Sequence, residues 1–242
     1  GDGGSVVINP ANPSQVFTTI YYGLGVKANE NGDILPDDLT TYPELFGEDF
    51  ANGNIGFYPP FVGNGVDNHL YFGSYRLFIS NDFGDTWYTP GWRRDLTKGA
   101  PPGARPDVLN AIAVARSNIN VIYTGSLFGR VMVTATAGRS WADVTAGLPN
   151  RSITSITVDP TNPAVAYITF SGYLTAHVYK TTNGGATWAK LSNGLPDVPT
   201  NTLLIDPRNN QTLYIGTDIG VFRSSDGGAQ TCPRGSGCAA GG

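Results

Sequence analysis

The chain has 242 residues, enough for one large all-β domain or two ordinary ones, and a small net charge of −4. Charged residues make up only 14% of it, while 32 glycines and 17 prolines indicate a turn-rich globular protein instead of a disordered one. It has no basic stripe and no apolar run of the ~20 residues that a membrane span needs, so neither nucleic-acid binding nor a transmembrane helix is expected.

Strand-like runs divided by turn residues recur in five units along the chain. The first unit, at about 1–51, opens with "INPANPSQVFTT", two such runs joined by an Asn-Pro turn, and carries an acidic insertion at about 25–56. The second, 52–99, places "SNDFGDTW" after the apolar run "RLFI", and the third, 106–149, contains "TATAGRSW". The fourth, 150–196, contains "VDPTNPAVAYIT" and "TTNGGATW"; the fifth, 197–242, contains "IDPRNNQTLYIG" and "SSDGGAQT".

The eight-residue segments form an internal repeat with a nearly constant period. Positions equivalent to Asp82 are Asn31, Thr136, Asn183 and Asp226, and the successive spacings are 51, 54, 47 and 43 residues. The fourth unit divides into four short runs, "ITSITV", "VAYITF", "HVYKTT" and "WAKL", rich in β-branched and aromatic residues. Four antiparallel strands in each of five units predict an all-β fold, a single β-propeller domain over 1–242, and no segment shows a helical period.

The last unit lacks a convincing fourth strand, because the sequence there becomes "CPRGSGCAAGG". A propeller closes when its first and last blades meet, so we expect either a five-bladed ring with unusual closure or, preferably, part of a larger ring. Cys232 and Cys238 enclose five residues in this tail, and they form either a small disulfide loop or two free thiols.

The pattern Ser/Thr-x-Asp-x-Gly-x-Thr-Trp resembles the Asp-box, or bacterial neuraminidase repeat, and is complete at Ser80, Asp82, Gly84, Thr86 and Trp87. The other copies keep part of it, at Thr136, Gly138 and Trp141, at Asn183, Gly185 and Trp188, and at Asp226 and Gly228. The resemblance implies a secreted bacterial propeller similar to sialidases and xyloglucan hydrolases, with each box a hairpin turn on the outer edge, away from the ligand. Because Thr and Asn cannot perform acid–base chemistry, we interpret the boxes as structural.

Glycosidase chemistry needs two carboxylates across the scissile bond, and the three glutamates of the chain all lie in the acidic insertion. The catalytic candidates are Glu44, Glu48, Asp2 and Asp107. Aromatic residues in or near the insertion could stack on sugar rings or bind a partner, namely Tyr42, Phe46, Tyr58 and Trp92. The simpler interpretation, which we prefer, is an exposed acidic loop whose aromatic residues cover the edge of the first two blades.

The segment "NENGDILPDD" offers oxygen ligands for a structural Ca²⁺ at Asn29, Asn31, Asp33 and Asp37, and no other cofactor is expected. His69 and His177 are far apart in sequence and give a His-based metal site little support. We therefore expect a secreted module, extracellular or periplasmic, that binds or scaffolds protein partners or a polysaccharide, and favour a non-enzymatic role. The alternative is a glycoside hydrolase, or a fragment of one.

Overall fold

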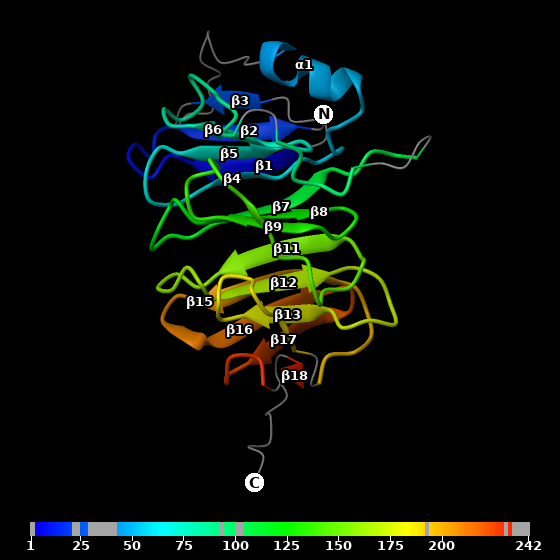
Figure 1. Cartoon of the computed structure of the whole chain (residues 1–242). Coiled ribbons are helices and arrows are strands. Elements are labelled where there is room, and N and C mark those ends of the chain that lie inside the picture. The colour runs from blue at the N-terminus through cyan, green and yellow to red at the C-terminus, as the bar shows by residue number, and fades with distance from the viewer. Residues whose placement is uncertain are drawn as a thin grey trace.

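Five antiparallel sheets follow one another along the chain and stack from the first to the last (Figure 1). The computed structural model describes residues 3–20, 25–28, 43–91, 94–99, 104–191, 194–229 and 232–233. Within each sheet, strands that are consecutive in sequence are paired with each other, as in the blades of a propeller. The prediction of an all-β propeller is therefore confirmed.

Each sheet lies within one of the five predicted units, and we call the sheets blades one to five. Blade one contains β1 (Gly3–Ile8), β2 (Val16–Ile20) and β3 (Gly25–Ala28), and blade two contains β4 (Phe61–Gly63), β5 (Leu70–Gly73) and β6 (Leu77–Ser80). Blade three contains β7 (Leu109–Val114), β8 (Ile122–Ser126), β9 (Val131–Thr134) and β10 (Ala142–Asp143). Blade four contains β11 (Ile153–Val158), β12 (Ala166–Phe170), β13 (Val178–Thr181) and β14 (Ala189–Lys190). Blade five contains β15 (Thr200–Asp206), β16 (Asn209–Thr217), β17 (Gly220–Ser224) and β18 (Cys232–Pro233).

Two details of the predicted strands differ from the structure. Blade five does have a fourth strand, since β18 pairs Cys232 with Arg223 and Pro233 with Phe222. In blade two a single bridge between Ile79 and Tyr88 takes the place of the fourth strand. The candidate disulfide cannot be placed, because Cys238 and the side chain of Cys232 lie outside the described residues.

The acidic insertion contains a helix, α1 (Pro43–Ala51), where the sequence showed no helical period. Proline is favoured at the first position of a helix, because its missing N–H would have no partner there, and Glu44 carries negative charge in the first turn. Nine residues are too few to reveal a period in the sequence, which explains why the helix was missed.

The hydrophobic core consists of separate layers between adjacent blades. One aromatic residue of each second strand fills the layer shared with the next blade, as Phe17, Tyr71, Tyr123 and Tyr167 do. These four side chains are at most 2% exposed. Burial raises the pKa of Tyr123 to about 12, so its hydroxyl stays protonated and donates a 2.9 Å hydrogen bond to the Pro163 carbonyl of blade four.

Each blade has two ends, and different loops between strands lie at each end. At one end, which we call the box end, the turn after the third strand of blades two to four bonds to the turn after the first strand, as in Gly184 N to Ala164 O at 2.9 Å. At the other, the entrance end, the turn after the second strand of blades three to five bonds to the segment that leads into the first strand, as in Leu127 N to Val108 O at 2.8 Å. The first strand of each blade, which we call its inner strand, begins at the entrance end. The inner strands are β1, β4, β7, β11 and β15.

Blade one and blade five lie at opposite ends of the stack (Figure 1). No closed ring is therefore formed by the part of the chain that the structure describes.

Candidate functional site

Asp82 of the first complete box is fully engaged in its own turn at the box end. Ser80 Oγ donates to Asp82 Oδ1 at 2.7 Å and accepts the Gly84 amide at 2.7 Å. The Thr86 amide donates to Asp82 Oδ1 at 2.9 Å, and the Thr86 hydroxyl donates to Oδ2 at 2.5 Å. Burial alone would raise the pKa of Asp82, but the hydrogen bonds from Thr86 and Ser80 outweigh it and lower that pKa.

The other boxes reproduce this hydrogen bonding with different side chains. In "TTNGGATW" the Thr187 amide donates to Asn183 Oδ1 at 2.9 Å, so an amide oxygen replaces the carboxylate. In "TATAGRSW" the Ser140 amide donates to the Thr136 hydroxyl at 2.9 Å. In "SSDGGAQT" Ser224 Oγ donates to Asp226 Oδ1 at 2.7 Å and accepts the Gly228 amide. A turn that tolerates Asp, Asn and Thr at one position requires an acceptor there and no negative charge.

The glycine of each box lies directly against the preceding blade. The four glycines have φ between 84° and 99°, and a Cβ atom on any of them would lie 2.5–2.8 Å from a side chain of that blade. The pairs are Gly84 with Phe17, Gly138 with Pro90, Gly185 with Val144, and Gly228 with Leu191. The glycine of each box therefore packs against the preceding blade and also lies in the turn of its own blade.

Polar side chains gather instead at the entrance end, beginning with a buried ion pair that holds α1. Arg76, in the turn between β5 and β6, donates from Nε and Nη2 to the two carboxylate oxygens of Asp49 at 3.0 and 2.9 Å. Ser74 Oγ adds a third hydrogen bond to Asp49 at 2.7 Å. Asp49 is 1% exposed and Arg76 4% exposed, so the acidic insertion is anchored onto blade two at this point.

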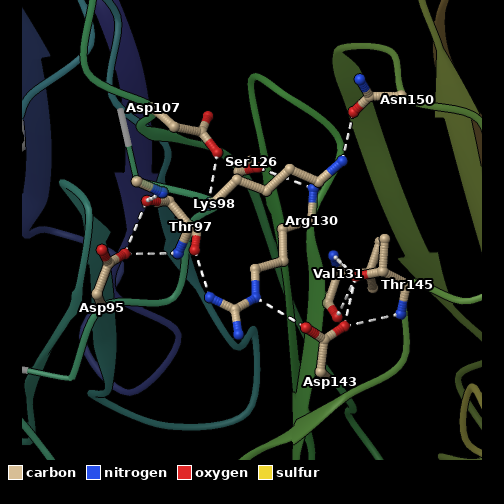
Figure 2. A network of polar contacts seen from close by, with 11 residues as sticks. Asp95, Thr97, Lys98, Asp107, Ser126, Arg130, Val131, Asp143, Thr145 and Asn150 are labelled. Carbon is tan, nitrogen blue, oxygen red and sulfur yellow. Dashed lines mark hydrogen bonds and ion pairs between the residues drawn. The ribbon is translucent and has the colours of Figure 1, made fainter. Parts of the chain in front are cut away.

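A second network fixes the segment that leads into β7 (Figure 2). Arg130, between β8 and β9, donates to Asp143 Oδ2 at 2.9 Å and also to the Thr97 carbonyl. Lys98 reaches across to the side chain of Asn150, next to blade four. These contacts tie the segment 94–99 to blade three and to the start of the fourth unit.

Asp107, a catalytic candidate from the sequence, lies in this network with its carboxylate occupied. Oδ2 accepts the Lys98 amide at 2.8 Å, and Oδ1 accepts the Phe128 amide at 2.9 Å. The residue is 2% exposed. This geometry suits a residue that anchors two loops, because both oxygens already accept backbone N–H groups and water has little access.

A pocket of about 330 Å³ opens at the entrance end beside the inner strands of blades one, two and three. It is lined by Gly4, Ser5, Thr19, Tyr58, Pro59, Pro60 and Asn110. Tyr58 is 53% exposed and packs edge-to-face against Phe57, with ring centroids 4.7 Å apart. None of the described residues that line the pocket is charged, and the polar groups there are hydroxyls and amides.

The remaining candidates from the sequence are only partly described. Glu48 is exposed on α1, and the side chains of Glu44 and Phe46 lie outside what the structure describes. The other undescribed candidates are Asp2, Tyr42 and Trp92, together with the calcium candidates Asn29, Asn31, Asp33 and Asp37. Among the described residues, no three His, Cys, Asp or Glu side chains form a group that could hold a metal ion.

Sequence reasoning missed one polar pair at the entrance end, between His177 and Asp197. The His177 ring Nε2 lies 2.9 Å from Asp197 Oδ1, and the Leu174 amide donates to the same carboxylate at 2.8 Å. The hydrogen bond with His177 lowers the pKa of Asp197. The only sequence signal for the pair was position, since His177 begins the predicted strand "HVYKTT" and Asp197 begins the fifth unit.

Comparison with known proteins adds information about the fold. No protein-family model and no curated protein matches the sequence. The GH74 enzyme of Niastella koreensis is similar in structure, with a TM-score of 0.66 and 19% identity, over 95% of this chain and 37% of that one. The GH74 xyloglucanase of Xanthomonas campestris gives a TM-score of 0.64 and 18% identity, over 95% of this chain and 38% of that one.

The extracellular domain of a hybrid two-component system from B. thetaiotaomicron is also similar, with a TM-score of 0.61 and 15% identity, over 96% of this chain and 27% of that one. The chain thus spans 27–38% of the length of these three proteins. The one helix in the described residues, α1, is too short to cross a membrane. At identities this low the similarity shows the fold alone, and the chain is a series of propeller blades like those of the GH74 enzymes.

Proposed function

We propose that this chain is an extracellular polysaccharide-binding module, and that a neutral sugar chain lies across the entrance end over the pocket at Tyr58. The observation that carries the proposal is the pocket itself. It lies where three inner strands begin, and an exposed tyrosine lines it beside hydroxyl and amide groups. Such combinations of an apolar ring and a few polar groups are typical of ligand sites.

The chemistry of the lining favours a neutral ligand. An aromatic ring offers its face to the C–H groups of a sugar, while its hydroxyl can bond to the sugar's own hydroxyls. Ser5, Thr19 and Asn110 supply further polar atoms, although the Asn110 amide already donates to the Ile153 carbonyl at 2.6 Å. An acidic polysaccharide would need a cation opposite each carboxylate, and the described lining contains no lysine or arginine.

The test is a calorimetric titration of the chain with neutral β-glucan oligosaccharides, including those of xyloglucan. We expect saturable binding that Tyr58→Ala weakens by about tenfold or more, which corresponds to ~1.4 kcal/mol. The matched control is Tyr88→Ala, since Tyr88 follows the first complete box and is similarly exposed, at 43%. Absence of binding, or equal affinity in wild type and Tyr58→Ala, would contradict the proposal.

The alternative is hydrolysis of the same polysaccharide, and the occupied carboxylates at the entrance end argue against it. Asp49 and Asp107 are buried and hydrogen-bonded within the protein, so neither is placed to protonate a leaving group. A hydrolase would therefore rely on other acids, such as the exposed Glu48, or Asp2 and Glu44, whose side chains lie outside the described residues. Release of reducing ends in the titrated samples would decide for the alternative.

A further inference from the structure

The four internal blade interfaces share one arrangement, which defines a leading and a trailing face for every blade. On its trailing face a blade presents the aromatic residue of its second strand, such as Tyr167, to the next blade. On its leading face the next blade presents two alternate residues of its first strand. They are aliphatic in blades three to five, as Leu203 and Ile205 are, whereas blade two has Phe61 and Gly63 at these positions. Leu203 and Ile205 are each 4% exposed and Tyr167 is 2% exposed, so the interface of blades four and five is a closed apolar layer.

The trailing face of blade five also presents an aromatic residue of its second strand, but no blade among the described residues packs against it. Tyr214 occupies the place of Tyr167 in its own blade. Tyr214 pairs with Arg223 and Tyr167 pairs with Lys180, and each partner is the residue just before the box of its blade. Leu204 pairs with Tyr214 and so lies on the same face, and its side chain is 58% exposed. The trailing face also includes Val221, which is 44% exposed.

No described blade packs against the leading face of blade one either. Asn9 and Asp206 occupy the same position in the strand–turn–strand repeat. Val6 and Ile8 precede Asn9 by three residues and one residue, and Leu203 and Ile205 precede Asp206 by the same spacings. Val6 is 63% exposed and Ile8 58% exposed, although their counterparts are buried. The intervening Val7 packs against blade two, as the period of two in a strand requires.

The two faces carry the counterparts of apolar and hydrogen-bonding groups that meet at the internal interfaces. At the interface of blades three and four, the Tyr123 hydroxyl donates to the carbonyl of Pro163 at 2.9 Å. Tyr214 is the counterpart of Tyr123, and Pro13 is the counterpart of Pro163, since each proline lies four residues after the Asn or Asp of its turn. The turn at Pro13 also has the internal hydrogen bonds of its counterpart, with Asn9 N bonded to Gln15 O as Asp159 N is to Val165 O.

We propose that the trailing face of blade five binds the leading face of blade one in a second copy of this chain, so that the copies associate head to tail. Blade one of the same copy is too far away to fill this role, because it lies at the other end of the stack (Figure 1). The surfaces on the two copies differ, so the contact is heterologous and leaves one complementary face open at each end of the assembly. The inference rests on the blade interfaces and is independent of the proposed polysaccharide site.

The test uses sedimentation velocity of the whole chain over a range of concentrations, with one variant for each face. Leu204→Glu places a carboxylate in the trailing face, and Ile8→Glu places one in the leading face. Each substitution should weaken self-association by at least about tenfold, because a buried carboxylate without a partner is costly. Since both side chains are exposed in the single chain, circular dichroism and the unfolding temperature should stay close to those of wild type.

Mixing the two variants makes the test specific for head-to-tail contact. Ile8→Glu keeps an intact trailing face and Leu204→Glu an intact leading face, so the mixture should form a dimer that grows no further. The matched control is Val66→Glu, on a turn at the box end, where Val66 is 53% exposed; it should associate like wild type. A wild-type chain that stays monomeric would overturn the proposal, as would association insensitive to either substitution or a mixture without dimer.

Discussion

The indole Nε1 of Trp188 donates a 2.8 Å hydrogen bond to the carbonyl oxygen of Val144, which belongs to the preceding blade. Trp87 and Trp141 instead donate to glycine carbonyls within their own boxes, Gly84 at 3.2 Å and Gly138 at 2.9 Å. Val144 also contacts the box glycine Gly185. One residue of blade three therefore meets both the ring and the turn of the fourth blade's box, which makes this contact a sensitive place to test how blades are joined.

Replacing Gly185 with alanine should destabilise the protein by at least ~2 kcal/mol, because the new Cβ adds both backbone strain and a clash. The residue has φ of 89°, and its Cβ would lie 2.8 Å from Val144 Cγ2. Urea unfolding measures the change. Gly147→Ala is the control, since Gly147 has φ of 83° but no atom within 4 Å of the new Cβ. If both substitutions cost the same, the contact with Val144 is unimportant.

Replacing Arg76 with methionine should cost about 3–5 kcal/mol, because it leaves the buried carboxylate of Asp49 without its cation. The guanidinium also lies 4.9 Å from the ring centroid of Phe78, so the substitution removes a cation–π contact as well. Unfolding by urea, followed by tryptophan fluorescence, gives the difference. The control is Arg116→Met, because Arg116 is exposed and donates only a 3.1 Å hydrogen bond to the Gly65 carbonyl. We expect this substitution to lower the free energy of unfolding by less than ~1 kcal/mol. Equal losses for the two arginines would contradict the importance of the ion pair.

Stability should fall as the pH drops through the carboxyl range, between about pH 5 and pH 3. The folded pKa values of Asp82 and Asp159 are lowered, because hydrogen bonds from neighbouring hydroxyls and amides outweigh the effect of burial. A lowered folded pKa contributes stability above the unfolded pKa, and this contribution is lost as pH falls toward the folded value.

The substitution Asp82→Asn tests this dependence at a single box. Asn183 already accepts the corresponding amide hydrogen bond at 2.9 Å, so the variant should fold and lose less stability than wild type on acidification. Chemical denaturation at a series of pH values measures the slope. An unchanged slope would show that Asp82 does not titrate differently in the folded and unfolded states.

Replacing Asp107 with alanine should lower stability by about 1–3 kcal/mol, because it leaves two backbone amides, those of Lys98 and Phe128, without their acceptor. Thermal unfolding measures the loss. Affinity for β-glucan oligosaccharides should change little at a temperature where the variant remains folded, since Asp107 does not line the pocket. A variant with wild-type stability that had lost binding or hydrolysis would assign the residue to the ligand site.

The sequence by itself predicted the period, the all-β class and the propeller fold. These properties depend on local chemistry, since alternating apolar residues, Asp-Pro or Asn-Pro turns and box glycines each act within a few residues of chain. Repetition then supplies the tertiary arrangement, because a blade that can pack against its neighbour once can do so in every repeat. The short helix α1 was not predicted from the sequence, because its nine residues belong to no repeat and are too few to show a helical period.

Only the tertiary structure decided which polar groups meet. Asp49 and Arg76 are 27 residues apart, and nothing in the spacing distinguishes Asp49 from the other acids of the insertion. In the same way, only the tertiary structure showed that Asp107 accepts two backbone amides at once and that Val6 and Ile8 lack the cover that Leu203 and Ile205 have. Such contacts depend on where separate loops and blades come together, and a periodic sequence specifies the repeated unit far more strongly than the loops that interrupt it.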